Sequence, residues 1–125
     1  MNSEIEIELD KLVISNNLDF KFCSYKDINW SKVIFCKAEG SYTRLFFENG
    51  KEIKFSKRIA VIYYYINSED FFRCHRKFVV NISKIKTIQF TNHPTICLKN
   101  GIFIPIALRR KSSFKKIIGK YLLAN

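Results

Sequence analysis

Residues 71–81 read FFRCHRKFVVN, and this stretch is the most informative part of the chain. Its second half, residues 78–80, is apolar and β-branched, which is typical of a strand. Directly before that strand, three cationic side chains bracket His75. A second cationic triplet occupies residues 109–111. One such triplet is typical of a solvated loop, whereas two in the same acid-free region favour a binding role.

Two Asn-Gly dipeptides, at residues 49–50 and 100–101, predict β-hairpins on either side of this stretch. Asn-Gly is the preferred dipeptide of the two-residue type I′ turn. The strands that flank these turns, with two further apolar or alternating runs, are expected at residues 33–36, 42–47, 52–55, 85–90, 95–98 and 102–106.

Two segments change to a helical period. In residues 57–66 the apolar side chains fall at i, i+3, i+4 and i+7, which is one face of a helix. Residues 108–123 keep the same spacing and predict an amphipathic helix over about 110–122, with a weak point at Gly119. The predicted fold class is mainly β with short helices near 57–66 and 110–122.

Length and composition exclude several classes of protein. The chain has 125 residues, which indicates one domain, and 47% hydrophobic residues exclude a disordered chain. No apolar run approaches the ~20 residues of a membrane span, so no membrane partner is expected. The N-terminus is acidic and is not a secretory signal, and we therefore expect a cytoplasmic protein.

The charge is distributed unevenly. The net charge is +11, yet residues 1–30 contain six acidic residues against three lysines. After Asp70 there are twelve basic residues and no acidic residue. A long stretch of one sign repels itself unless a polyanion supplies the opposite charge. Nucleic acid, an anionic membrane surface and an acidic protein are the candidate partners.

Motifs for catalysis, cofactors and metals are absent from the sequence. There is no phosphate-binding glycine loop, no H-E-x-x-H and no G-x-S-x-G, so we expect no enzyme, no cofactor and no metal site. The four cysteines lie among apolar residues, as reduced buried thiols do. Cys74 is flanked by Arg73, His75 and Arg76, which could stabilise a thiolate and weakly indicate redox sensitivity.

Three blocks of the sequence resemble LytTR-type DNA-binding domains. Residues 71–81 are similar to the signature F-[FL]-R-[VICA]-H-[RK]-S-[FY]-[LIV]-V-N, with Lys77 in place of its serine. Residues 33–43, VIFCKAEGSYT, are similar to the opening strand and its A-x-G-x-Y-T loop. Residues 99–110 resemble the closing segment, with Ala107 where a serine is frequent. The resemblance covers residues 25–123 and leaves 1–24 as an acidic N-terminal extension.

The resemblance implies both a fold and a function. The family fold is an elongated set of small stacked antiparallel sheets with short helices. Members are output domains of bacterial response regulators in two-component systems, and they control transcription. They insert loops into successive major grooves of promoter sites that contain repeats, so the implied partners are double-stranded DNA and a second copy on direct repeats.

The resemblance also implies which residues bind DNA. Base contacts come from three loops, with Thr43, Arg76 and Arg109 as the leading residues and phosphate contacts beside them. The full set comprises base-reading candidates Ser41, Tyr42, Thr43, Arg44, Arg76, Lys77, Arg109 and Arg110, and phosphate-binding candidates Lys57, Lys84 and Lys111. In this family the histidine corresponding to His75 packs and hydrogen-bonds behind its loop.

Because the N-terminal extension is too short for a receiver domain, the chain is expected to be either an excised fragment or a stand-alone regulator in which an unidentified signalling partner replaces the receiver. Within the extension, Glu4, Glu6 and Glu8 alternate with apolar residues, which predicts an edge strand with one acidic face. Two alternative functions remain open at this point. Tyr42, Phe46 and residues 63–65 could stack bases of RNA or single-stranded nucleic acid, or the basic face could bind an anionic surface by charge alone.

Overall fold

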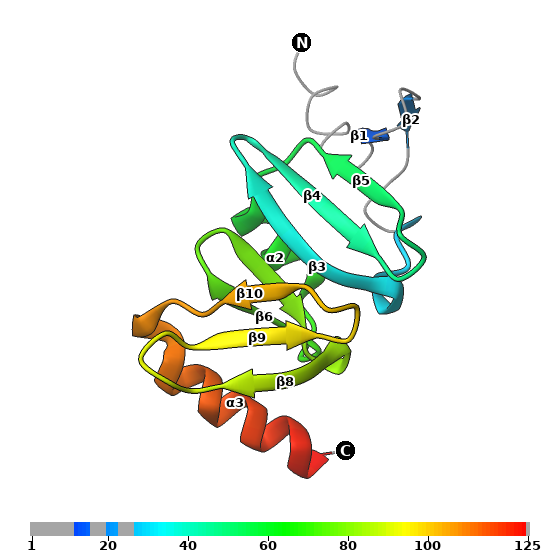
Figure 1. Ribbon diagram of the computed structural model, residues 1–125. Coiled ribbons are helices and arrows are strands. Elements are labelled where there is room, and N and C mark those ends of the chain that lie inside the picture. Colours follow the sequence, from blue (N-terminus) through cyan, green and yellow to red (C-terminus); the bar gives the residue numbers. More distant parts are fainter. Residues whose placement is uncertain (1–11, 16–19, 23–26, 125) are drawn as a thin grey trace.

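The structure is a computed structural model that describes residues 12–15, 20–22 and 27–124. These residues form two antiparallel sheets with short helices (Figure 1). The seven-stranded sheet has the order β2-β1-β5-β4-β3-β7-β6, and the three-stranded sheet has the order β10-β9-β8. The strands of the two sheets are β1 (Leu12–Ser15), β2 (Phe20–Phe22), β3 (Val33–Glu39), β4 (Tyr42–Phe47), β5 (Glu52–Phe55), β6 (Phe71–His75), β7 (Phe78–Asn81), β8 (Ile85–Gln89), β9 (Thr95–Leu98) and β10 (Phe103–Pro105).

In the described part of the chain, α-helices and 3-10 helices complete the fold. They are α2 (Ile59–Ile66), α3 (Lys111–Ala124), η2 (Trp30–Lys32), η3 (Ile82–Lys84) and η4 (Leu108–Arg110). The mainly β class and both helices predicted from the apolar spacing are confirmed. Helix α3 continues through Gly119, because the apolar face that docks Phe114, Ile117 and Ile118 on the core offsets the low helix propensity of one glycine.

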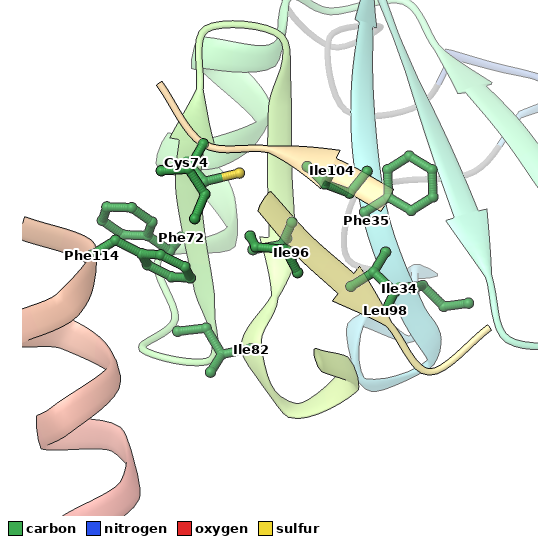
Figure 2. Close-up of a cluster of buried hydrophobic side chains, with 11 residues drawn as sticks. Ile34, Phe35, Phe72, Cys74, Ile82, Ile96, Leu98, Ile104 and Phe114 are labelled. Carbon is green, nitrogen blue, oxygen red and sulfur yellow. The ribbon is translucent and has the colours of Figure 1, made fainter. Parts of the chain in front are cut away.

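The seven-stranded sheet separates two hydrophobic cores. On one face, buried side chains of β3, β4 and β5 pack against Ile59, Ile62 and Ile66 of α2. On the other face, β3, β6 and β7 pack against the three-stranded sheet and α3, as Figure 2 shows. There Phe114 of α3 is fully buried and stacks on Phe72 of β6, with ring centroids 4.9 Å apart. The strands that end at the candidate site are thus fixed from both sides.

Both predicted hairpins form, but their turns differ from the predicted type. Within these two turns the glycines, Gly50 and Gly101, have positive φ of +87° and +89°, but the asparagines do not. A type I′ turn needs positive φ at both residues. The Gly50 N–H donates to the Phe47 carbonyl at 3.0 Å, and the Phe47 N–H donates to the Lys51 carbonyl at 2.9 Å. Each hairpin is therefore a three-residue loop with a left-handed glycine, in which the asparagine side chain accepts from the second residue after it.

Asn81, the last residue of the signature stretch, ties the sheet together. Its side chain is 2% exposed, and its Nδ2 donates to the Val33 carbonyl at 2.8 Å. Its Oδ1 accepts from the Ser83 N–H at 3.0 Å and so caps η3. A buried amide that is satisfied on both atoms fixes the register of β7 against β3.

The N-terminal region contributes to the larger sheet. Strand β1 pairs with β5, with Val13 opposite Phe55, and β2 pairs with β1. Sequence analysis did not predict these two strands within the acidic extension. The edge strand predicted at Glu4, Glu6 and Glu8 lies outside the described residues, and the boundary near residue 24 stays a prediction. No helix among the described residues is long and apolar enough to cross a membrane.

Candidate nucleic-acid interface

Three turns from distant parts of the sequence lie along one side of the molecule. They are the β3–β4 turn at residues 40–41, the β6–β7 turn at residues 76–77, and η4, and we call them the three-turn edge. The Ala38 N–H donates to the Lys77 carbonyl and the Ala107 N–H to the Cys74 carbonyl, both at 2.9 Å. In Figure 1 all three follow the left side of the view.

Most of the predicted base-reading residues are exposed at this edge. Ser41 and Tyr42 are exposed in and after the first turn, and Arg76 and Lys77 form the second turn. Arg109 is exposed in η4. The structure therefore brings together three segments that the sequence separates by about 30 residues each.

The β6–β7 turn is held from within by its own side chains. The Arg73 guanidinium donates to the Arg76 carbonyl at 2.7 Å, and the Lys77 N–H donates to His75 Nδ1 at 3.1 Å. His75 thus acts behind the turn, as the family resemblance implied. Partial burial, and then the charges of Arg76, Lys77 and Arg110, hold its pKa below the ordinary value. A neutral imidazole is what the hydrogen bond to Nδ1 requires.

Helix η4 is fixed to the same strand by Arg110. Its Nη1 donates to the Arg73 carbonyl at 3.1 Å, and its N–H donates to the Ala107 carbonyl at 2.8 Å. Burial lowers the pKa of Arg73, and the positive charges of Arg110 and Arg109 lower it further. Each of the two clamping guanidiniums thus binds a carbonyl oxygen instead of a carboxylate, while its buried Nε has no hydrogen-bond partner, and the cluster keeps its positive charge.

Thr43 does not belong to this surface, so the prediction that it reads a base is wrong. Its side chain is 0% exposed, and its Oγ1 donates to the Lys57 carbonyl at 2.6 Å. Alternation along β4 explains the result. Thr43 and Leu45 face the α2 core, whereas Tyr42 and Arg44 face outward. Thr43 instead fixes the start of the β5–α2 connection, where Lys57 is half-buried.

Arg44 faces outward but is already paired. Its Nε and Nη2 donate to the two carboxylate oxygens of Glu39 at 2.9 and 3.0 Å, and its Nη1 donates to Glu52 at 3.1 Å. Lys54 also lies 3.6 Å from Glu39. The hydrogen bond from Arg44 holds the pKa of Glu39 below its ordinary value. Two carboxylates thus already bind this arginine, and its pairing in the structure does not support the base contact predicted for it.

Lys84 is separated from the three-turn edge by the length of β7. It follows Asn81, whereas the β6–β7 turn precedes Phe78. Its Nζ binds the Glu48 carboxylate, which also lies 3.6 Å from Lys32. Lys84 therefore leaves the candidate site. Lys111 stays near η4, with its Nζ donating to the Thr91 carbonyl at 3.0 Å.

The thiol of Cys74 has the opposite character from the one its cationic neighbours indicated. Cys74 is 0% exposed, and Figure 2 shows its sulfur directed into the hydrophobic cluster. Burial raises the pKa of this thiol to about 12. Arg73 and His75, which flank Cys74 in β6, occupy the alternate positions that face away from the core. Among the described residues no three side chains of histidine, cysteine, aspartate or glutamate gather as metal ligands would.

Sequence analysis missed two features of the edge. Arg73 was counted only as a cation, although it braces both neighbouring turns through its side chain and its carbonyl. Leu108 was given no role in the prediction, yet it is 67% exposed in η4. A break in the apolar spacing at residue 108, six residues before the buried Phe114, is the signal that could have found it.

The fold and the three-turn edge together define a β-sheet domain that presents uncompensated positive charge on rigid turns, the class of a nucleic-acid-binding module. The family model described as LytTr DNA-binding domain matches residues 24–119. The chain belongs to this family. Its function is accordingly DNA binding and transcription regulation, the role of DNA-binding domains of response regulators in two-component systems. The family is a DNA-binding family and not an enzyme family.

A solved structure supports the fold independently. The chain is similar to the LytTr DNA-binding domain of a putative methyl-accepting/DNA response regulator from Bacillus cereus, with a TM-score of 0.69 and 24% sequence identity. The match covers 87% of this chain and 98% of that one. No curated protein matches the sequence.

Proposed function

We propose that this protein binds duplex DNA sequence-specifically by inserting the three-turn edge into the major groove of promoter sites. The observation that carries the proposal is the separation of roles among the arginines of the edge. Arg73 and Arg110 brace the turns through carbonyl oxygens, while Arg76 and Arg109 remain exposed. Free guanidinium forks on a braced backbone suit bidentate contact with guanine edges.

Charge favours a phosphate backbone as the general partner. The acidic residues of the described part of the chain lie at or before Asp70, and Glu39, Glu48 and Glu52 are bound by Arg44, Lys84 or Lys32. Among the described residues, no carboxylate pairs with the cations of β6, the β6–β7 turn and η4. Phosphate contacts by Lys57, Lys77 and Lys111 would fix the register of the protein on the duplex.

The aromatic residues give less support to single-stranded nucleic acid. Phe46 stacks on Phe35 with ring centroids 4.2 Å apart, and Tyr63 packs against the α2 core. Tyr64 and Tyr65 are more exposed but lie on α2 and not at the three-turn edge. Stacking platforms need several exposed rings along the charged path, and at this edge Tyr42 is the exposed aromatic residue.

Three further elements of the proposal concern the cellular context. Two copies bind direct repeats, a signalling partner controls the binding, and the protein acts in the cytoplasm. The family's role in response regulators motivates all three.

The experiment is selection of bound duplexes from a random library at about 150 mM salt. We expect enrichment of a short motif, present as a spaced direct repeat. Salt-sensitive binding without any enriched motif would overturn sequence-specific recognition. Competition of the enriched duplex by single-stranded DNA or RNA of the same sequence gives the second test, because a single-strand binder would prefer those competitors. If anionic vesicles competed for the protein as well as the enriched duplex does, charge alone would explain the binding.

A further inference from the structure

Leu108 is a large apolar side chain placed on an otherwise cationic edge. It is 67% exposed, whereas Ile106 and Phe114 on either side are 4% and 0% exposed. Single exposed leucines are common on protein surfaces. This one is unusual in its setting, because Arg109 next to it is exposed and Arg110 turns back to the Arg73 carbonyl.

The backbone that carries Leu108 is held at several points. The Ile106 N–H donates to the Pro94 carbonyl at 3.0 Å, and the Ala107 N–H donates to the Cys74 carbonyl at 2.9 Å. The Arg110 N–H closes η4 on the Ala107 carbonyl at 2.8 Å. A side chain on such a segment is presented in one place, so little ordering entropy is lost when a ligand covers it.

The major groove offers an apolar group that a leucine can contact. Thymine presents its C5-methyl group there, whereas the other base edges present hydrogen-bond donors and acceptors. Leu108 and Arg109 are adjacent and both exposed, so one can cover a methyl group while the other reaches a neighbouring base.

We infer that Leu108 contacts the C5-methyl group of a thymine beside the base pair that Arg109 reads. This inference rests on the proposed function and assigns one base of the recognised site. It makes Leu108 a specificity-determining residue that acts through apolar contact, without a hydrogen bond.

The test uses the duplex enriched in the selection, synthesised with deoxyuridine in place of each thymidine in turn. This replacement removes one methyl group and keeps the base pairing. At one position we expect wild-type affinity to fall about fourfold, the effect of one buried methyl-sized group. Leu108→Ala is expected to bind the thymidine duplex more weakly and to lose the difference between thymidine and deoxyuridine at that position.

Leu123→Ala is the matched control, because Leu123 is 89% exposed near the end of α3. This variant should keep the wild-type deoxyuridine response. Equal deoxyuridine responses in the wild type and Leu108→Ala, or a motif without thymine, would overturn the inference and leave sequence-specific binding intact. Wild-type binding without any sequence preference would overturn the proposed function itself, and the two failures are therefore distinguishable.

Discussion

Two surfaces of this molecule carry arginine side chains, and only one of them presents arginines that no described carboxylate binds. On the outer face of β3, β4 and β5, which we call the paired face, Glu39 and Glu52 bind Arg44 through three hydrogen bonds of 2.9–3.1 Å. At the three-turn edge Arg73 and Arg110 bind carbonyl oxygens, and Arg76 and Arg109 are exposed. Availability to a ligand thus depends on what lies diagonally across the sheet.

The register of the strands explains the difference. Glu39 lies opposite Tyr42 and Glu52 lies opposite Phe46, so each carboxylate is diagonal to Arg44. Diagonal neighbours in an antiparallel pair are within reach of long side chains. No acidic residue follows Asp70 in the sequence, so β6, β7 and η4 contain no residue that could neutralise their arginines in this way.

The largest effect is expected from removing a free arginine. Arg109→Ala should weaken binding to the enriched duplex by about 1–3 kcal/mol, and much less on random DNA, because a bidentate base contact is lost. Isothermal titration or band-shift measurements at fixed salt would provide both values. Arg44→Ala is the matched control and should leave DNA affinity nearly unchanged. If both variants lost affinity equally, the contrast between the two surfaces would fail.

The next effect concerns the buried hydroxyl behind the first turn. Thr43→Val keeps the shape of the side chain but leaves the Lys57 carbonyl without its partner at 2.6 Å. Loss of one such hydrogen bond should lower the free energy of unfolding by about 1 kcal/mol. Urea unfolding followed by circular dichroism would measure it. DNA affinity of the folded variant should change little, and a large selective loss of affinity would restore Thr43 as a DNA contact.

A smaller effect, on the salt dependence of DNA binding, distinguishes the β6–β7 turn from the opposite end of β7. Binding that neutralises about six phosphates gives a slope of log K against log salt near −5. Lys77→Ala should reduce the steepness of that slope by about one. Lys84→Ala should not change it, because its ammonium group binds Glu48 at the opposite end. Equal changes in both slopes would mean that DNA covers both ends.

The smallest effect is a difference between the two surfaces in how their contribution to stability depends on pH. The pKa of His75 is lowered by partial burial and then by the neighbouring cations, so the unfolded chain binds this proton more readily. Stability should therefore begin to fall as the pH drops below about 6.5. The pKa of Glu39 is lowered chiefly by its hydrogen bond from Arg44, so its contribution should be lost only below about pH 4.3.

The measurement is Tm as a function of pH. His75→Gln should flatten the profile between about pH 7 and 5.5, and Glu39→Gln should flatten only the more acidic part. A wild-type profile that is flat down to pH 5 would contradict the role of neutral His75 behind the β6–β7 turn.

Local sequence patterns predicted much of the fold because helical spacing and turn preference depend on residues that are close in the sequence. The apolar spacing of residues 57–66 gave α2, and the Asn-Gly dipeptides gave both hairpins. The turn type was wrong, since a three-residue loop with a left-handed glycine uses the same dipeptide. Strands β1 and β2 were missed because they are short runs within the acidic extension, and β1 pairs with β5, which lies about 40 residues later.

By itself the sequence determined the class, the acid-free stretch and the family, because composition and three ordered motifs are properties of the chain alone. It also indicated that the cations around His75 lie beside a strand end. Only the tertiary structure decided which of the candidate side chains are exposed and unpaired. Thr43 is buried by the alternation of β4, Arg44 is neutralised across the sheet, and Lys84 lies at the far end of β7. Each outcome depends on which strands pair and on which face of the sheet packs on the core, and a strand read alone shows neither.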